Sequence, residues 1–256
     1  MTTSTHHDNV SAQFGSQATD YLTSKVHAAG RDLQRLAATL AQWPQAHVLD
    51  VGCGAGHASF VAASQVARVT AWDLSQQMLD VVAQAAQARG LTNIDTRQGV
   101  AEKLSFDDGQ FDVVISRYSA HHWHDVGAAL REIHRVLKSD GILIVMDVIS
   151  PGHPVFDIWL QTVEALRDTS HVRDYSSAQW SEMLSDSGLA LVNMERDKLE
   201  LEFDSWVQRM RTPKVMVDAI RAWQVSASQP VQEYFRLQPD GSFTSDIGWF
   251  MARKEM

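Results

Sequence analysis

The sequence has few cysteines and no long hydrophobic run, which argues against a disulfide-rich, a zinc-binding and a membrane-spanning protein. Cys53 is the only cysteine among 256 residues, which excludes an internal disulfide framework and a cysteine-rich zinc site. A single thiol fits a reducing compartment, so we expect a cytoplasmic protein. The longest apolar stretch, residues 141–146, is about one strand long and too short to span a bilayer. The segment MTTSTHHDNV at the start lacks the basic and apolar regions expected of a secretory signal.

Positive charge is also scarce. The chain carries 22 lysines and arginines against 31 aspartates and glutamates, which gives a formal net charge of −9 at pH 7. An acidic surface repels phosphate backbones, so the composition argues against a nucleic-acid partner. Hydrophobic residues make up 45% and charged residues 21% of the chain, as in an ordinary globular protein. Without internal repeats or low-complexity linkers, residues 1–256 are expected to form a single domain.

Strand-like and helix-like patterns alternate over about the first 150 residues. The expected strands are continuous apolar runs at 47–51, 68–72, 93–97, 111–116 and 141–149. The expected helices, with apolar residues at helical spacing, are at 30–42, 57–65, 75–90 and 126–141. Continuous apolar strands are typical of a parallel sheet with helices on both faces. The pattern therefore predicts an α/β, doubly wound, Rossmann-like fold.

The chain changes character after residue 150. Five of the eight tryptophans lie there, and helical segments dominate up to about residue 240. Segments 189–201 and 242–255 have the pattern of two late strands, which we expect to form an antiparallel pair at the edge of the sheet. The prediction is a mostly parallel, seven-stranded sheet with a helical insertion before the last strands.

The strongest functional motif is the glycine-rich segment VLDVGCGAG, residues 48–56. Glycines permit a tight turn between a strand and a helix and let backbone amides approach a ligand closely. The dinucleotide pattern G-x-G-x-x-G is absent, because the sixth position counted from Gly52 is His57. Asp50, near the end of the first strand, would repel a pyrophosphate but can hold an ammonium group. The motif favours a ligand with an amino acid end over a plain strand-to-helix turn.

A second acidic residue, Asp73, ends the next expected strand. It lies 21 residues after Gly52, close to the spacing at which an acidic residue binds ribose hydroxyls in doubly wound folds. One carboxylate can accept hydrogen bonds from both hydroxyls. The alternative is that Asp73 caps the helix that starts near Ser75. Its place at the end of a strand favours ribose binding.

Four motifs occur in order along this part of the chain: VLDVGCGAG, AWDLSQQML, GVAEKLSFDDGQFDVVISRYSAHHW and REIHRVLKSDGILIVMD. In this run the sequence resembles the class I S-adenosylmethionine-dependent methyltransferases. Within that family it resembles the small-molecule branch that includes the ubiquinone/menaquinone and biotin-pathway methyltransferases. The resemblance covers about residues 10–150. Two later stretches, LRDTSHVRDYS and FDSWVQRMRTP, resemble a bacterial subgroup with no assigned substrate.

The resemblance implies S-adenosyl-L-methionine as the cofactor and a role for each matching residue. The residues that would contact its methionine end are Asp50, Gly52, Cys53, Gly54, Ser116 and Arg117. Those that would contact the ribose and the adenine are Asp73, Leu74, Met78, Ala101 and Glu102. Phe14 and Tyr21 match an N-terminal helix that closes over the cofactor in this branch.

The sequence departs from the family pattern at three places. Val100 stands where many relatives have an aspartate, so a side-chain bond to the adenine amino group is not expected there. Ser105 replaces the usual proline before Phe106. Ser139 and Asp140 replace the usual Pro-Gly before the fifth strand. The last two departures affect turn geometry only.

A cluster of histidines, His121, His122 and His124, follows the fourth expected strand. No H-E-x-x-H motif or second acidic cluster accompanies them, so no metal is predicted. Histidine titrates near neutrality, which makes His121 a candidate general base, and Tyr118 is a further catalytic candidate. The alternative is a family loop in which one histidine packs beside the cofactor and the others cap or face solvent.

These observations predict a methyltransferase that acts on a small, partly apolar molecule. The sulfonium methyl is already activated for in-line displacement, so the protein must place the acceptor and exclude water. The expected division is a lid at 1–28, a cofactor-binding core at 29–150 and a substrate-side region at 151–256. The alternatives are a nicotinamide-dependent oxidoreductase and a cofactor-binding, non-catalytic partner protein. The expected partner is the small-molecule acceptor, without nucleic acid or a membrane span, and the oligomeric state is left open.

Overall fold

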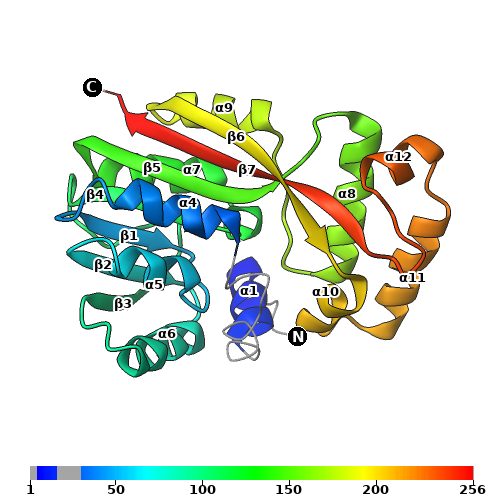
Figure 1. Cartoon of the computed structure of the whole chain (residues 1–256), viewed down its shortest axis with the longest axis horizontal. Helices are drawn as coiled ribbons and strands as arrows, with labels where there is room; N and C mark the ends of the chain where they lie inside the picture. The colour runs from blue at the N-terminus through cyan, green and yellow to red at the C-terminus, as the bar shows by residue number, and fades with distance from the viewer. Residues whose placement is uncertain (1–4, 16–29, 256) are drawn as a thin grey trace.

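The computed structural model of the chain describes residues 5–15 and 30–255 (Figure 1). It contains a seven-stranded sheet with the strand order β3-β2-β1-β4-β5-β7-β6. The strands are β1 (His47–Val51), β2 (Arg68–Asp73), β3 (Ile94–Gln98), β4 (Phe111–Arg117), β5 (Leu137–Ile149), β6 (Leu189–Leu201) and β7 (Phe243–Lys254). Strand β7 runs antiparallel to β5 and β6, and the other pairings are parallel. The predicted doubly wound, mostly parallel sheet with a late antiparallel pair is confirmed.

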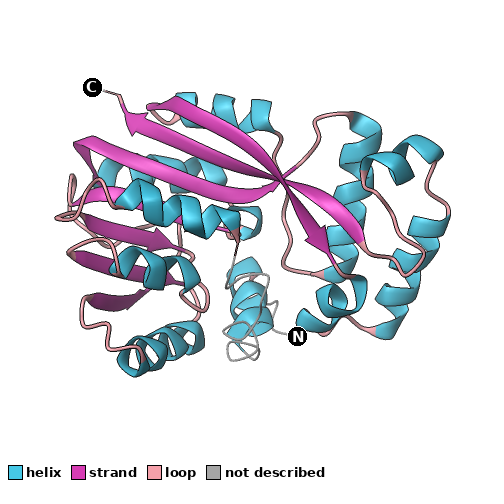
Figure 2. Ribbon diagram, viewed as in Figure 1, coloured by secondary structure: helices cyan, strands magenta, loops and turns pink. Residues whose placement is uncertain are grey.

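Helices cover both faces of the sheet because successive side chains of each strand point to opposite sides. Figure 2 shows the helices around the strands, and they are α4 (Arg31–Leu40), α5 (His57–Ala63), α6 (Gln76–Ala88), α7 (Val126–Val136) and α9 (Ser177–Asp186). Val48 of β1 belongs to the same apolar cluster as Leu36 of α4. Its neighbour Leu49 belongs to a second cluster, with Ile133 of α7. The ligand-facing loops of such a sheet gather at the carboxyl ends of the parallel strands.

Four further helices form a lobe beside the sheet (Figure 1). They are α8 (Pro154–Arg167), α10 (Phe203–Arg209), α11 (Lys214–Val225) and α12 (Gln229–Tyr234). Trp159, Trp206 and Phe235 pack there in an apolar cluster with Phe243 of β7. The expected insertion before the last strands is thus divided in two. Helices α8 and α9 precede β6, whereas α10, α11 and α12 lie between β6 and β7.

The helix expected at 126–141 ends earlier, at Val136, and β5 begins at Leu137. Leu137 has extended backbone angles, is fully buried and pairs with Phe111 of β4. The helical pattern in the sequence continues through the polar residues after Leu137. The helix nevertheless ends before Leu137, because this residue is buried and paired within the sheet. Strand β5 is therefore 13 residues long rather than the nine expected.

Helix α1 (His6–Gly15) lies between the sheet and the helical lobe (Figure 1). The Gln13 Nε2 donates a hydrogen bond to the Met210 carbonyl at 3.1 Å. The ring of His6 contacts the His122 carbonyl, with Nε2 and O 2.8 Å apart. These two contacts join α1 to the helical lobe, through Met210, and to the loop after β4, through His122. Among the helices formed by residues 5–15 and 30–255, none has the length and apolar character needed to cross a membrane.

Candidate active site

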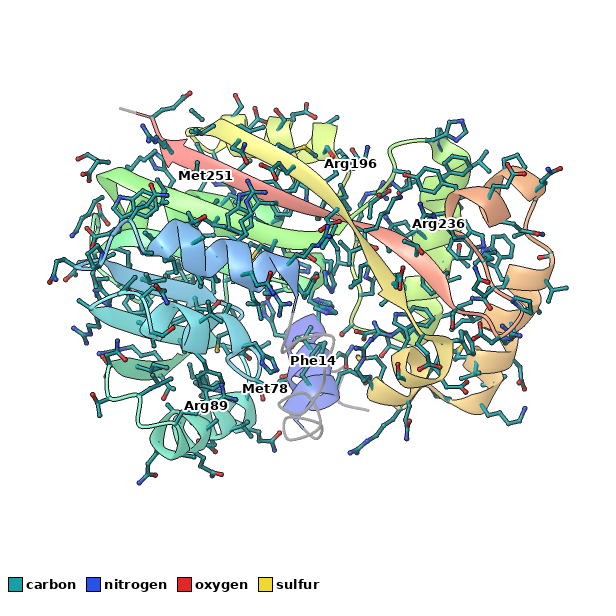
Figure 3. The ribbon with its side chains drawn as sticks, in the orientation of Figure 1. Phe14, Met78, Arg89, Arg196, Arg236 and Met251 are labelled. Atoms are coloured by element: carbon teal, nitrogen blue, oxygen red, sulfur yellow. The ribbon has the colours of Figure 1, made fainter. Side chains whose placement is uncertain are left out.

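A first cavity lies at the carboxyl ends of β1, β2 and β4, and α1 forms one of its walls. Most of the predicted cofactor-binding residues line it: Asp50, Gly52, Cys53, Gly54, Asp73, Leu74, Met78, Ala101, Glu102 and Arg117. From α1 it is lined by His7, Val10, Ser11 and Phe14. Figure 3 shows Phe14 and Met78 close together, on α1 and α6, and the two residues share one apolar cluster. The predicted residue Tyr21 lies outside the described part of the chain.

The glycine-rich turn after β1 has a backbone that only glycine adopts easily. Gly52 and Gly54 have φ angles of 70° and 50°. A Cβ atom at Gly52 would lie 1.8 Å from the Ser119 Oγ, so a side chain there would collide with the loop after β4. The backbone N–H groups of Gly52 and Cys53 donate to the Trp72 carbonyl at 2.8 and 3.1 Å. The turn is thereby fixed to the end of β2 with its backbone against the cavity.

Asp73 holds this turn and the start of α6 in place. Its Oδ2 accepts a hydrogen bond from the Gly54 N–H and its Oδ1 accepts one from the Ser75 N–H, each at 2.8 Å. Burial raises the pKa of Asp73, although these backbone donors act in the opposite direction. The N-cap of α6 is Ser75, whose Oγ accepts from the Met78 N–H. Asp73 therefore does not cap the helix itself, and each carboxylate oxygen keeps acceptor capacity toward the cavity.

Asp50 is a buried carboxyl with one unsatisfied oxygen. Its side chain is 1% exposed, and its Oδ2 accepts from the Ser59 Oγ at 2.6 Å. The Oδ1 is buried and has no hydrogen-bond partner within residues 5–15 and 30–255. Burial raises the pKa of Asp50 to about 7. A buried carboxylate without a partner is costly, so a cation in the cavity would stabilise it.

The other predicted residues occupy distinct positions around the first cavity. Glu102 accepts hydrogen bonds from the His124 and Asp125 N–H groups at 2.8 and 3.2 Å, so it also anchors the loop before α7. Arg117 donates from Nε to the Asp32 carboxylate of α4. Ser116 differs from expectation, because it is fully buried within β4 and does not line the cavity.

Tyr118 follows β4 in a left-handed conformation, with a φ of 50°. The Arg117 guanidinium carbon lies 4.5 Å from the centre of its ring. Burial raises the pKa of Tyr118 further above its ordinary value of 10.0. The phenol therefore stays protonated at neutral pH, and it can donate a hydrogen bond more readily than it can take up a proton.

His121 and Asp147 form a buried pair. The His121 Nδ1 lies 2.5 Å from the Asp147 Oδ1, which also accepts from the Val148 N–H. The Ala120 N–H donates to the Asp147 Oδ2 at 2.9 Å. Burial lowers the pKa of His121, but the Asp147 carboxylate outweighs this effect and raises it to about 9. His122 differs, because burial and the charge of His121 lower its pKa to about 3.

A second cavity lies next to the first, and His121 lines it. The two cavities share Phe14, Tyr118 and His122. The remaining residues of the second cavity come from β5, α8 and the loop after it, β6 and α10: Val148, Glu164, Arg167, Asp168, Asp174, Leu199, Leu201, Trp206 and Arg209. None of these residues belongs to a motif that is recognisable in the sequence. The only signal was that LRDTSHVRDYS and FDSWVQRMRTP, which supply several of them, resemble a bacterial subgroup.

Within residues 5–15 and 30–255, no three histidine, cysteine, aspartate or glutamate side chains are arranged to hold a metal ion. The ring of His124 lies 6.0 Å from that of His6 and 6.2 Å from that of His7. These rings pack loosely where α1 meets the loop after β4.

Comparison with known proteins places these features in context. Residues 49–145 match a family model described as a methyltransferase domain. The Escherichia coli protein YafE, which is uncharacterized, is 65% identical over 79% of this chain and 98% of its own length. The Bacillus subtilis methyltransferase YcgJ, also uncharacterized, is 38% identical over 78% of this chain and 79% of its own. The crystal structure of YcgJ covers 87% of this chain and 99% of its own, with a TM-score of 0.82. A demethylmenaquinone methyltransferase of Chlorobaculum parvum is 35% identical over 42% of this chain and 43% of its own.

Proposed function

This chain belongs to the class I S-adenosylmethionine-dependent methyltransferases, and from that membership we propose that it methylates a small, partly apolar molecule by in-line displacement. The observation that carries the proposal is the wall of Phe14, Tyr118 and His122 shared by the two cavities. A donor in the first cavity and an acceptor in the second would meet at this wall. The related demethylmenaquinone methyltransferase is named for a small-molecule acceptor, which supports the same class of substrate.

The residues of the first cavity fit S-adenosylmethionine. The unsatisfied Asp50 Oδ1 would accept from the ammonium group of the methionine end. The Asp73 carboxylate, held by the Gly54 and Ser75 N–H groups, would accept from the two ribose hydroxyls. The side chains of Leu74 and Met78 offer an apolar surface to the adenine. When bound, the cofactor supplies a methyl group that its sulfonium has already activated.

The protein's own task is to place the acceptor and to remove a proton where the acceptor carries one. We assign the proton to His121, because its Nδ1 is held by Asp147 and its ring lines the second cavity. Since the pKa of His121 is about 9, only its neutral form, which increases as the pH rises toward that value, can accept the proton. The Asp147 carboxylate would stabilise the imidazolium that forms. Tyr118, protonated and at the shared wall, would orient the acceptor by hydrogen bonding.

We assign to the N-terminal segment, residues 1–28, the role of a lid over the cofactor, with residues 29–150 as the cofactor-binding core and 151–256 as the substrate side. The described part of the lid, α1, lines the first cavity with His7, Val10, Ser11 and Phe14. Bound cofactor would bury these side chains further. Proteolytic cleavage within residues 6–15 should therefore slow when S-adenosylhomocysteine is added, and equal rates would contradict the lid.

Calorimetric titration separates the proposed function from its alternatives. S-adenosylmethionine and S-adenosylhomocysteine should both bind the wild-type protein, whereas NAD⁺ should give no binding heat. Transfer of a labelled methyl group to a small molecule should accompany binding. Binding of NAD⁺ in preference to S-adenosylmethionine would contradict the proposal. Cofactor binding without transfer to any small molecule would favour the non-catalytic partner.

A further inference from the structure

Asp174 is a second buried carboxyl that lacks a partner, and it lies in the second cavity. Its side chain is 2% exposed, and its Oδ2 has no hydrogen-bond partner among the residues that the structure describes. The Gln161 side chain fixes its backbone, accepting from the Asp174 N–H at 3.1 Å and donating to the Asp174 carbonyl at 2.8 Å. The chain therefore holds this carboxyl in the cavity wall without satisfying it.

The positive charge of His121 favours the ionised form of Asp174, but burial and the neighbouring carboxyls outweigh it. The His171 Nε2 lies 4.0 Å from the Asp174 Oδ2, but burial lowers the pKa of His171 to about 2, so the ring is neutral. Burial raises the pKa of Asp174 well above its ordinary value. A buried carboxyl of this kind destabilises the fold unless a ligand supplies the missing partner.

The other ionisable groups around the second cavity are largely committed to protein partners. Glu164 pairs with Arg167, with Oε2 and Nη1 3.3 Å apart. Asp168 accepts from the N–H and the hydroxyl of Ser170 at 2.8 and 2.6 Å. A second guanidinium, from Arg209 of α10, also lines the cavity.

The carboxyl groups around His121 favour a positively charged ligand group at this end of the second cavity. After burial, which opposes protonation, the carboxyls of Asp147, Asp174 and Glu164 raise its pKa. Their combined effect exceeds that of burial, so this end of the cavity favours a positive charge. Another part of the cavity wall is apolar and is formed by Val148, Leu199, Leu201 and Trp206.

We propose that the second cavity binds an acceptor that carries an amine on an otherwise apolar body, with Asp174 holding the amine as an ammonium group. The inference rests on the proposed function, because it names the substrate class of the same methyl-transfer site. It assigns to Asp174 a contact with the substrate.

The proposed reaction balances as an N-methylation. The bound R–NH₃⁺ gives one proton to the His121 Nε2, and the nitrogen lone pair of R–NH₂ then forms a bond to the methyl carbon. The carbon–sulfur bond breaks and its electron pair stays on sulfur, which gives S-adenosylhomocysteine and R–NH₂⁺–CH₃. The proton on His121 passes to solvent. A bound ammonium group also repels a proton on His121, which lowers the pKa of His121 and favours its neutral, basic form.

Three probes with the same apolar body test the proposal: 2-phenylethylamine, 2-phenylethanol and phenylacetate. Each is titrated by calorimetry into wild-type protein saturated with S-adenosylhomocysteine at neutral pH. The amine should bind more tightly than the alcohol, and phenylacetate should bind most weakly. The variant Asp174→Asn should weaken amine binding about tenfold or more, since it removes a charge-assisted hydrogen bond. The control Asp186→Asn, at an exposed site on α9, should bind the amine as the wild type does.

A measurement of thermal stability distinguishes a substrate-binding role of Asp174 from a purely structural one. Because burial and the Glu164 carboxyl outweigh the favourable charge of His121 when no ligand is bound, Asp174→Asn should melt at the same temperature as the wild type or higher. Equal or tighter binding of phenylacetate, unchanged amine binding by Asp174→Asn, or no binding by any probe would each overturn the amine assignment. Failure of S-adenosylhomocysteine to bind in the first step would overturn the proposed function instead.

Discussion

The Nδ1 of His121 and the Oδ1 of Asp147 lie 2.5 Å apart in a buried pair. The protonation of the His121 ring therefore depends on the Asp147 carboxylate. This pair links the end of β5 to the loop that separates the two cavities. It sets the protonation state of the residue to which we assign the acceptor's proton.

The first prediction concerns the titration of His121. Its ring should titrate at about pH 9 in the wild type, because Asp147 overcomes the effect of burial. In Asp147→Asn the largest effect that raises the pKa is lost while burial remains, so the ring should titrate at a clearly lower pH than in the wild type. NMR of the imidazole Cε1–H across the pH range measures both values. Titration near neutrality in both proteins would show that the pair does not control this histidine.

Stability should depend on pH through the same pair. The pKa of His121 is about 9 in the folded state and 6.5 ordinarily, so its stabilising effect is complete below pH 6.5 and is lost as the pH rises through 9. The loss is roughly 3 kcal/mol of unfolding free energy for the wild type. Urea unfolding at both ends of this range should show it, and His121→Gln should lose clearly less. Parallel losses in the two proteins would assign the effect to other groups.

Asp50 should control cofactor affinity in a pH-dependent way. Its pKa is raised to about 7, so the carboxylate that would pair with the ammonium forms as the pH rises through that value. S-adenosylmethionine should therefore bind more tightly at about pH 8 than at about pH 6. Calorimetry on Asp50→Asn should show weaker binding, roughly tenfold or more, without this pH dependence. A variant that keeps the pH dependence would place the titrating group elsewhere.

Asp73 should contribute most to affinity among single side chains. Asp73→Ala would lose two charge-assisted hydrogen bonds to the ribose, so binding of S-adenosylmethionine should weaken by about 3 kcal/mol, roughly a hundredfold. Asp73→Asn should lose less, because it keeps one acceptor oxygen. Since Asp73 also binds the Gly54 and Ser75 N–H groups, thermal melts must show that both variants remain folded. Asp95→Asn, an exposed carboxylate on β3, is the matched control. Binding by Asp73→Ala within about threefold of the wild type would refute the ribose assignment.

The sequence predicts the fold well where the signal is local. Segment 189–201 was expected as a strand, and β6 has the same bounds, Leu189–Leu201. The end of α7 was not predictable in this way. It depends on Leu137 pairing with Phe111, which is distant in sequence. The division of the helical insertion around β6 likewise follows from packing of the lobe rather than from any local pattern.

The two cavities also differ in how far their residues can be predicted from local sequence. The first is built from short motifs at the ends of successive strands, so Asp50, the glycines and Asp73 are recognisable from the sequence, and the resemblance of these motifs to the family implies the others. The second brings together α8, the loop after it, β6 and α10, which are far apart in the chain. The burial of Asp174 within a polar sequence, RDTSHVRDYS, is a tertiary property that no local pattern carries.

A crystal structure of the complex with S-adenosylhomocysteine would show the proposed site in full. We predict the ammonium group at the Asp50 Oδ1, the ribose hydroxyls at Asp73, and the sulfur directed at the wall of Phe14, Tyr118 and His122. The methyl group of the donor would then point into the second cavity. A ligand bound outside the first cavity, or with its sulfur directed away from that wall, would contradict the proposed arrangement of donor and acceptor.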